Sequence, residues 1–316
     1  MSVISDSDLR ELIKIEKSTH TGQYIATCPF CGKEGHFYIN KVTQVWDCKR
    51  CGESGNIYKL LRFFDKLYLV QGTSVEVRET IRGLREVEEA EEETLTQLPE
   101  ISMPVGWKPF SKPNAYLQGR GVTLSIAQRY EMGETRMLSK FKNYILIPIR
   151  DEGRICGFIG RYADKHVPDG KLRYNNSVGT QFAQLLFGYD EITDNTKTVV
   201  LVEGVFDKIA VDRYLHLWND ELVRCCCTFG KKISSAQILK LKQKKIRRVV
   251  LLYDFDAVKE MKKYGIILNQ DFITDIVFTT KKDIDECTPE EAIAVFERTY
   301  KPDDFNVDVI GKLKRK

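Results

Sequence analysis

The stretch Thr198-Val-Val-Leu-Val-Glu-Gly204 is a run of apolar, mostly β-branched residues that ends abruptly in a carboxylate. A continuous apolar run of this length is typical of a strand that is buried on both faces of a parallel sheet. The segment that follows, from Val205, carries Ile209, Ala210 and Tyr214 at helical spacing. Open α/β sheets place their sites at the carboxyl ends of strands, so this stretch predicts an α/β domain with Glu203 as a candidate site residue.

The pattern of a strand followed by acids occurs twice more. The run Arg248–Tyr253 precedes Asp254-Phe-Asp256, and a strand expected at Asp275–Thr280 precedes Asp283-Ile-Asp285. Alternate residues of an extended strand end point the same way, so we expect Asp254 and Asp256 to meet one cation. A single acidic pair is more often a solvated turn. Three acidic strand ends in one sheet, however, would repel one another unless they held a divalent metal, which favours a Mg²⁺ site.

Four of the nine cysteines form two C-x-x-C pairs, Cys28 with Cys31 and Cys48 with Cys51, and each pair is followed by glycine. Two such knuckles place four thiolates at the corners of a tetrahedron, as a structural Zn²⁺ site requires. Because sulfur fills all four positions, we expect the metal to be structural and not catalytic. Free or redox-active cysteines are the alternative, but they are less common at this spacing.

Around these cysteines the sequence predicts a small ribbon. Ser5 and Asp8 can form a capping box, so a helix is expected from Asp6 to about Lys17. Aromatic and aliphatic residues between the knuckles either fill the ribbon core or stack on unpaired bases, and we favour the core for Phe37, Ile39 and Trp46. The other expected elements are strands at Tyr24–Thr27, His36–Asn40 and Val45–Asp47 and a helix from about Asn56 to Asp65.

The segment from Lys108 to Arg173 carries 13 Lys or Arg against 6 Asp or Glu, interleaved with tyrosines. Such a surface suits a polyanion whose bases remain free to stack, although a charge excess alone is more often a solvated face. Within it, Ile145–Ile149 has the composition of a buried strand and Phe158 that of a core residue. The segment therefore favours nucleic acid as a partner without establishing it.

A second basic segment runs from Lys231 to Arg248 and contains eight Lys or Arg and no acid. It either grips a nucleic-acid template or forms a solvated helix face, and the sequence leaves both interpretations open. Cys225–Cys227, just before it, is expected to be a buried strand, because adjacent side chains alternate between faces and do not share one ion.

Composition limits the class of protein. The 316 residues have a net charge of +4, and the acidic run Glu86–Glu93 indicates a linker or a solvated helix. There is no apolar run of the ~18 residues that a membrane span needs, and no secretory leader, so we expect a cytoplasmic protein without a membrane partner. The chain also lacks a P-loop, which argues against a fused helicase motor.

These motifs resemble the DnaG-type primases of bacteria and their phages. The run from Cys28-Pro-Phe-Cys31 to Cys51-Gly-Glu-Ser-Gly-Asn-Ile57 looks like their zinc-binding domain. Ala115-Tyr-Leu-Gln-Gly-Arg-Gly121, the run Ile145–Arg161 and Leu172-Arg-Tyr-Asn-Asn-Ser177 are similar to the basic subdomain of their RNA polymerase core. The acidic strand ends are similar to the Toprim domain that these primases share with topoisomerases and some nucleases.

The resemblance implies a role for individual residues. Glu203, Asp254 and Asp256 would bind the catalytic Mg²⁺ or Mn²⁺, and Asp207, Asp283 and Asp285 would assist them. The residues implied along the path of template and nucleotide are Arg120, Arg161, Arg173 and Lys231.

The chain departs from the family pattern in three places. Cys31 stands where bacterial members usually have histidine, which points weakly to a phage protein. Arg173 stands where a lysine is common, and the two side chains are not equivalent as phosphate ligands. Ala257-Val-Lys259 replaces the usual Ala-Gly after the aspartate pair, so the helix there is expected to pack differently.

Together these observations predict a multidomain α+β and α/β chain with an N-terminal zinc ribbon, a basic α+β subdomain and a Rossmann-like Toprim domain. The resemblance implies a DNA primase that makes short RNA primers de novo on single-stranded DNA from ribonucleoside triphosphates, with a replicative helicase as a separate chain, in a bacterial or phage-infected cell. The alternatives are another Toprim enzyme, such as a nuclease or topoisomerase, and a non-catalytic single-strand-binding factor. The expected units are a zinc ribbon (1–70), an acidic linker (71–107), a basic subdomain (108–195), a Toprim domain (196–300) and a basic tail (301–316).

Overall fold

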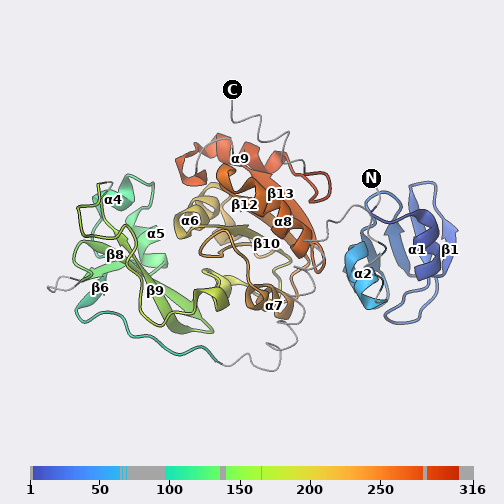
Figure 1. Cartoon of the computed structure of the whole chain (residues 1–316), viewed down its shortest axis with the longest axis horizontal. Coiled ribbons are helices and arrows are strands. Elements are labelled where there is room, and N and C mark those ends of the chain that lie inside the picture. Colours follow the sequence, from blue (N-terminus) through green and yellow to red (C-terminus); the bar gives the residue numbers. More distant parts are fainter. Residues whose placement is uncertain are drawn as a thin grey trace.

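The computed structural model describes residues 3–64, 66, 69, 97–135, 140–164, 166–279 and 283–305. The acidic run Glu86–Glu93 and the end of the basic tail, Lys312–Lys316, lie outside the described residues. Three sheets follow one another along the chain, and the parallel one lies between the other two (Figure 1). No helix among the described residues is long and apolar enough to cross a membrane.

The N-terminal ribbon is an antiparallel sheet of order β1-β2-β3-β4-β5, flanked by two short helices. The predicted core is confirmed, since Phe37, Ile39 and Trp46 are at most 1% exposed. The indole of Trp46 stacks on Phe37 and donates a 2.6 Å hydrogen bond to the carbonyl of Asn56, the N-cap of α2. The elements are α1 (Asp6–Leu12), β1 (Ile15–Ser18), β2 (Gln23–Ala26), β3 (Phe37–Asn40), β4 (Trp46–Cys48), β5 (Ser54–Gly55) and α2 (Ile57–Phe63).

The first helix is shorter than the sequence predicts. The capping box of Ser5 and Asp8 is confirmed, but α1 ends at Leu12 and not near Lys17. The next residues form β1, which pairs with β2 and so extends the sheet by one strand. The prediction was wrong because β-branched Ile13 and Ile15 tolerate either conformation, and pairing with β2 decides between them.

The middle unit is an antiparallel sheet of order β6-β7-β8-β9 with two short helices on it. Its centre is the long hairpin of β8 and β9, which turns at Glu152-Gly153, both with positive φ. The predicted strand Ile145–Ile149 lies within β8, and Phe158 is 3% exposed, so both expectations are confirmed. The elements are β6 (Trp107–Pro109), α4 (Ala115–Gln118), α5 (Leu124–Arg129), β7 (Gly133–Thr135), β8 (Tyr144–Asp151) and β9 (Arg154–Tyr162), followed by the 3-10 turns η2 (Phe182–Gln184) and η3 (Tyr189–Glu191).

The third unit is a parallel sheet of order β11-β10-β12-β13, which confirms the α/β prediction. Helices α6 and α9 cover one face, and α7 and α8 cover the other. The elements are β10 (Thr198–Val202), α6 (Val205–Tyr214), η4 (Leu217–Asn219), β11 (Val223–Cys227), α7 (Ser235–Gln243), β12 (Arg248–Tyr253), η5 (Phe255–Ala257), α8 (Val258–Leu268), β13 (Ile273–Phe278), η6 (Ile284–Glu286) and α9 (Pro289–Glu297).

Alternate residues of each strand enter two different cores. Val200 and Val202 pack on the α6 side, whereas Val199 and Leu201 pack on the side of α7 and α8. The predicted cysteine strand behaves in the same way, because Cys225 and Cys227 join the first core and Cys226 the second. Both faces of the sheet are therefore buried, as the continuous apolar runs predict.

A fully buried lysine joins the middle unit to α6. Its three ammonium donors have three acceptors: Lys208 Nζ lies 2.6 Å from Glu191 Oε1, 2.6 Å from Asp212 Oδ2 and 2.9 Å from the Tyr130 hydroxyl. Burial alone would lower the pKa of Lys208, but the two carboxylates hold it well above its ordinary value. A second buried pair, Lys240 with Asp151 at 2.6 Å, ties α7 to β8. The middle unit and the parallel sheet are thus held together by paired charges as well as by a shared core.

Replacement of Lys208 by methionine is expected to destabilise the folded chain by about 3–5 kcal/mol, because Asp212 would remain buried, and Glu191 half-buried, without a counter-charge. Urea unfolding followed by circular dichroism measures this loss. The matched control is Lys17→Met on the exposed strand β1, which we expect to change stability by less than about 0.5 kcal/mol. Equal midpoints for the two variants would contradict the role of the network.

Candidate active site and metal centre

Carboxylates from several elements gather at the carboxyl edge of the parallel sheet. Glu203 follows β10 and Asp254 follows β12, while Asp283 precedes η6 in the segment after β13. Asp254 and Asp283 share a side-chain hydrogen bond, and Glu203 lies within electrostatic reach of both. The first turn of α6 adds Asp207, whose Oδ2 accepts the Gly204 N–H at 2.9 Å. Parallel pairing of neighbouring strands brings these acids together, although they are up to 80 positions apart in the chain.

Burial at this edge of the sheet raises the pKa of several acids. Burial, reinforced by the charges of Asp283 and Glu203, raises the pKa of Asp254 to about 7. Burial likewise raises the pKa of Glu203 and of Asp285, and it raises that of Asp207 well above the ordinary value. The carboxylates are therefore held in a site that disfavours their ionised forms, as expected for groups that a cation would neutralise.

Two oxygens at this edge have no hydrogen-bond partner within the part of the chain that the structure describes. They are the buried Oε2 of Glu203 and the buried Oδ1 of Asp285. An unpaired buried carboxylate oxygen is costly unless a cation or an ordered water meets it. The acids do not form a closed cage, because among the described residues only the four cysteines converge as a metal-binding group. An open arrangement fits Mg²⁺, which keeps several waters and is usually held by only one or two carboxylates.

The sequence expectation for Asp256 was wrong in geometry. The chain leaves its extended path after Tyr253 and turns through η5, so Asp254 and Asp256 do not alternate along a strand. The Asp256 side chain is 61% exposed and pairs with Lys231 at 2.9 Å. Lys231 itself lies in the loop after β11, at the same edge of the sheet, and its ammonium also interacts electrostatically with Glu203. Asp256 thus lies at the exposed rim of the cluster.

One of the three predicted arginines contacts the cluster directly, and a second is joined to the first through a tyrosine. Arg120 forms an ion pair with Asp285, and its Nε lies 3.1 Å from the Tyr116 hydroxyl. Arg161 is 4% exposed and donates from Nε to the same hydroxyl at 2.8 Å. Tyr116 therefore bridges the two arginines, a role that no sequence motif indicated.

Arg173 is placed differently. Its carbonyl accepts the Tyr162 N–H at 3.0 Å, but its exposed side chain has no hydrogen bond or ion pair with the described residues. Its neighbour Tyr174 lies against the Arg161 guanidinium at 4.8 Å. The segment therefore reaches the arginine pair through Tyr174 and not through Arg173.

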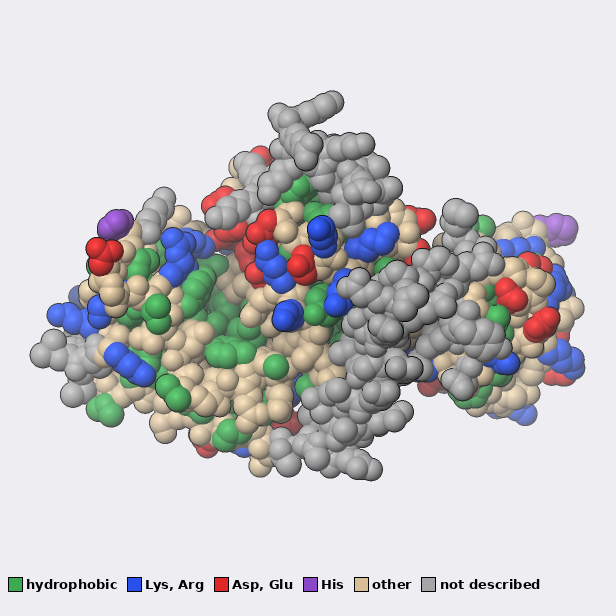
Figure 2. All heavy atoms as spheres, in the orientation of Figure 1, with side chains coloured by type: hydrophobic (Ala, Val, Ile, Leu, Met, Phe, Trp, Pro, Cys, Tyr) green, Lys and Arg blue, Asp and Glu red, His purple; other side chains and the backbone are tan. Residues whose placement is uncertain are grey.

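A pocket of about 390 Å³ opens beside Glu203. Its walls include Tyr174, Phe206 and Phe229, and the Oδ1 of Asn176, another lining residue, is buried without a partner in the described chain. Figure 2 shows acidic side chains next to Lys and Arg at the centre of the molecule, beside a patch of hydrophobic side chains on the middle unit. Sequence reasoning missed this pocket because its aromatic residues look like ordinary core residues.

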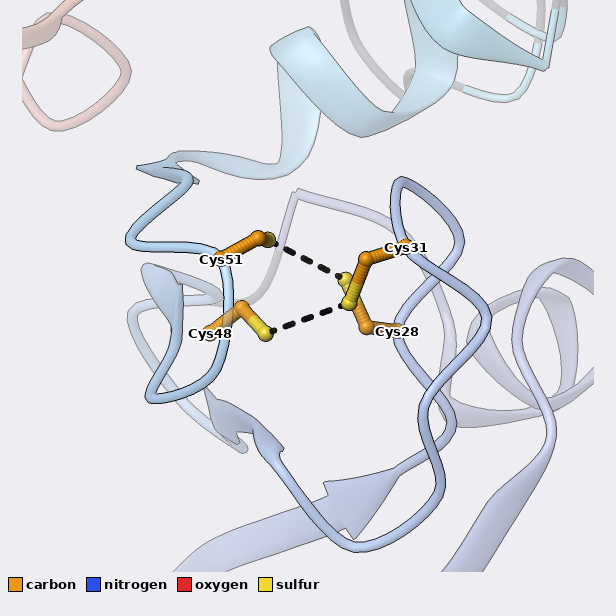
Figure 3. A group of neighbouring side chains, drawn as sticks. All are labelled: Cys28, Cys31, Cys48 and Cys51. Carbon is orange, nitrogen blue, oxygen red and sulfur yellow. Dashed lines mark hydrogen bonds between the residues drawn. The ribbon is translucent and has the colours of Figure 1, made fainter.

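The four predicted cysteines converge at the other end of the chain (Figure 3). Their sulfur atoms all lie within 4.8 Å of one another, with Cys28 Sγ 3.9 Å from Cys51 Sγ and Cys31 Sγ 3.9 Å from Cys48 Sγ. Sulfurs at the corners of a tetrahedron around zinc, at about 2.3 Å from the metal, are separated by about 3.8 Å. The geometry therefore fits the predicted Cys₄ site.

The backbone prepares one of these thiols to bind a metal. Burial raises the pKa of Cys48, but hydrogen bonds from the N–H groups of Cys51 and Arg50, together with those of the Cys51 and Cys28 thiols, outweigh it and lower that pKa to about 7. The Arg50 N–H lies 3.4 Å from Cys48 Sγ. A thiolate already favoured by the backbone is the form that zinc binds.

Comparison with known proteins supplies relatives but no family model, since none matches. The chain is 27% identical over 309 residues to a DNA primase of Legionella pneumophila. The aligned region covers 81% of this chain and 51% of the relative. It is also 26% identical over 268 residues to a DNA primase of Salmonella typhimurium, and the aligned region covers 67% of this chain and 45% of the relative. The chain thus spans about half the length of these curated relatives.

Among solved structures, the chain is similar to the zinc-binding and RNA polymerase domains of Aquifex aeolicus primase, and the superposition covers 98% of this chain and 82% of that one. The sequence identity is 19% and the TM-score is 0.43.

Replacement of Cys51 by serine is expected to remove the metal from the ribbon, because one of four thiolates is lost from a site that fits tetrahedral zinc. Elemental analysis of the purified full chain measures the metal content per molecule. Cys156→Ser is the matched control, since Cys156 is a buried cysteine outside the cluster. A wild-type protein without bound zinc, or a Cys51 variant that retains it, would contradict the assignment.

Stability of the metal-free protein is expected to fall as the pH rises. The pKa of Asp254 is about 7 in the folded chain against an ordinary value of 3.8, so the folded state binds its proton more tightly than the unfolded state does. The stabilising contribution of the Asp254 proton is complete at pH values below the ordinary pKa of 3.8, and it is lost as the pH rises through about 7. Thermal melts between these limits in a chelating buffer test this, and Asp254→Asn should flatten the decline. A melting temperature that rises over this range would contradict the sign.

Proposed function

Because the chain resembles DnaG-type DNA primases over 81% of its length, we propose that it is a DNA primase that synthesises short RNA primers de novo on single-stranded DNA. The observation that carries this proposal is the carboxylate cluster at the edge of the parallel sheet, with paired arginines beside it. Acids that hold a divalent cation next to cations that hold phosphates are what nucleotidyl transfer requires.

Glu203, Asp254 and Asp256 are proposed to hold Mg²⁺ or Mn²⁺, with Asp207, Asp283 and Asp285 in support. The unpaired oxygens of Glu203 and Asp285 support such a site. A bound divalent ion would neutralise the charge that develops on the α-phosphate and on the departing pyrophosphate. The ion pair of Lys231 with Asp256 keeps a cation at the rim, where the phosphates of a triphosphate would enter.

The reaction proposed is attack of a ribonucleotide 3′-hydroxyl on the α-phosphate of an incoming ribonucleoside triphosphate. The hydroxyl loses its proton to solvent and its oxygen forms a new bond to the α-phosphorus. The bond between the α-phosphorus and the oxygen that bridges to the β-phosphate breaks, and pyrophosphate leaves with that oxygen. Arg120 and Arg161, aligned by the Tyr116 hydroxyl, are proposed to position phosphates of template and nucleotide, with Arg173 at the exposed approach. The aromatic pocket beside Glu203 has the size and the walls to hold a nucleobase.

The remaining assignments follow from the same proposal. The ribbon (1–70) would bind structural Zn²⁺ through its four cysteines and recognise the template. The acidic segment (71–107) would link the ribbon to the core. The basic subdomain (108–195) and the Toprim domain (196–300) would form the polymerase, and a basic tail (301–316) would follow them. A replicative helicase in a separate chain is the proposed partner, in the cytoplasm of a bacterial or phage-infected cell. Nothing in the described geometry favours a nuclease, a topoisomerase or a binding-only factor.

Replacement of Asp256 by alanine is expected to lower primer synthesis by about 100-fold or more, because a charge that helps to hold the cation is lost. Asp256 is 61% exposed, so the variant should fold normally. The assay follows incorporation of labelled ribonucleotides on circular single-stranded DNA without a primer, with Mg²⁺ or Mn²⁺. Asp194→Ala, which removes an exposed carboxylate on a distant loop, is the matched control.

Three outcomes separate the candidate functions. RNA made by the wild type and the control but not by the Asp256 variant supports the primase. A wild type that nicks the circle and makes no RNA would instead indicate a Toprim nuclease. DNA binding without either reaction, even when a replicative helicase is added, would indicate the binding-only factor.

A further inference from the structure

The ribbon packs against the edge of the parallel sheet that lies opposite the carboxylates. Arg247, which directly precedes β12, donates a 3.3 Å hydrogen bond to the Gly52 carbonyl of the ribbon. The Asn56 side chain donates to the carbonyl of Phe272, which directly precedes β13, at 2.6 Å. Strand β12 has six residues, so its two ends are about 20 Å apart at 3.3 Å per residue. The ribbon thus faces a surface that the proposed catalysis does not use.

A cleft of about 700 Å³ lies between the ribbon and this amino edge. Helix α2 of the ribbon contributes Lys59 and Arg62 to its lining, and the end of α7 with the loop after it contributes Lys242, Lys245 and Arg247. Against these five cations the lining contains two acids, Glu53 and Asp271. The cleft therefore carries an excess of positive charge from both of its walls.

The two acids of the cleft already have partners. Glu53 pairs with Lys59 at 2.8 Å, and Asp271 pairs with Arg62 and lies 3.9 Å from Lys242. Lys245 and Arg247, by contrast, are exposed and form no ion pair with the described part of the chain. Two cations without a carboxylate partner in one cleft are suited to the phosphates of a polyanion.

An aromatic row ends in the same cleft. The ring of Trp46 in the ribbon core stacks on Phe30 with centroids 5.0 Å apart, and Phe30 contacts Phe63 at 4.7 Å. Phe63 is 52% exposed and lies outside the buried core of the ribbon. The exposed ring of Phe63 packs on the half-buried Phe30, which in turn stacks on the buried Trp46. Such a ring is a platform on which an unpaired base can stack.

We propose that this cleft binds single-stranded nucleic acid, with backbone phosphates along Lys245 and Arg247 and a base stacked on Phe63. A duplex is excluded as the occupant, because its bases are stacked on one another and offer no face to the ring. The site deepens the primase proposal and rests on it, since the ribbon is there proposed to recognise the template, but binding at the cleft requires neither metal nor nucleotide. It would hold a strand at the edge of the sheet remote from the acids, so that the ribbon and the amino edge together form a second contact with the template or with the product.

The charge part of the proposal is tested by fluorescence anisotropy with the full chain and a labelled single strand of about 12 nucleotides, without metal or nucleotide. Each lost phosphate contact makes the negative slope of log K against log salt shallower by about 0.7. The Lys245→Ala, Arg247→Ala double variant should therefore reduce the magnitude of this slope by about 1.4 and weaken binding about 25-fold at 0.1 M salt. The control double variant is Lys14→Ala, Lys17→Ala, which removes the same charge beside and on β1, at the far edge of the ribbon sheet. Equal slopes and affinities for the two double variants would overturn the proposal.

The stacking part has its own test. Phe63→Leu keeps an apolar side chain but loses the aromatic face, so it should weaken binding about 5-fold or more with an unchanged salt slope. Photocrosslinking with 5-iodouracil in the strand should label Phe63 in the wild type. Labelling confined to the middle unit or to the carboxylate edge would overturn the proposal, whatever the Asp256 variant shows in primer synthesis.

Discussion

Burial of both faces of the parallel sheet is the constraint on which the rest of this structure depends. Alternate residues of β10 and β12 enter two separate cores, so neither strand has a face left for polar chemistry. Charged groups can then occupy only the two ends of the strands. The carboxyl ends carry Glu203 and Asp254, and the amino ends meet the zinc ribbon through Arg247 and Phe272. The location of both proposed nucleic-acid surfaces follows from this one packing requirement.

The carboxylate edge has a free-energy cost that the surrounding structure offsets. Burial, reinforced by the nearby charges of Asp283 and Glu203, raises the pKa of Asp254 to about 7. Arg120 and Lys231 relieve part of this repulsion through their pairs with Asp285 and Asp256. One oxygen of Glu203 and one of Asp285 have no hydrogen-bond partner among the described residues, so this relief is incomplete there. The incomplete relief supports the proposed cation site.

Rigid attachment of the middle unit completes the site. Arg161 comes from β9 of that unit, whereas Asp207 and Lys208 lie on α6 of the parallel-sheet unit. The contacts of the buried Lys208 with Glu191 and Tyr130, and the Lys240–Asp151 pair, join one unit to the other at two separate points. Arginines and acids that belong to different sheets are thereby positioned relative to one another, as the proposed nucleotidyl transfer would require.

Local signals in the sequence were sufficient to predict much of this protein. The C-x-x-C spacing, the capping box at Ser5, the apolar runs ending in Glu203 and Asp254 and the cysteine strand all depend on neighbouring residues, and the structure has each of them in place. Where the local sequence was compatible with two conformations, tertiary contacts determined which one the chain adopts. Helix α1 ends early because β1 pairs with β2, and Asp256 turns to the rim because the chain enters η5. Likewise only the packing of distant segments could bring Tyr116 between two arginines, bury Lys208 among three acceptors and open a basic cleft beside Phe63, because contacts between remote residues leave no periodic trace in the sequence.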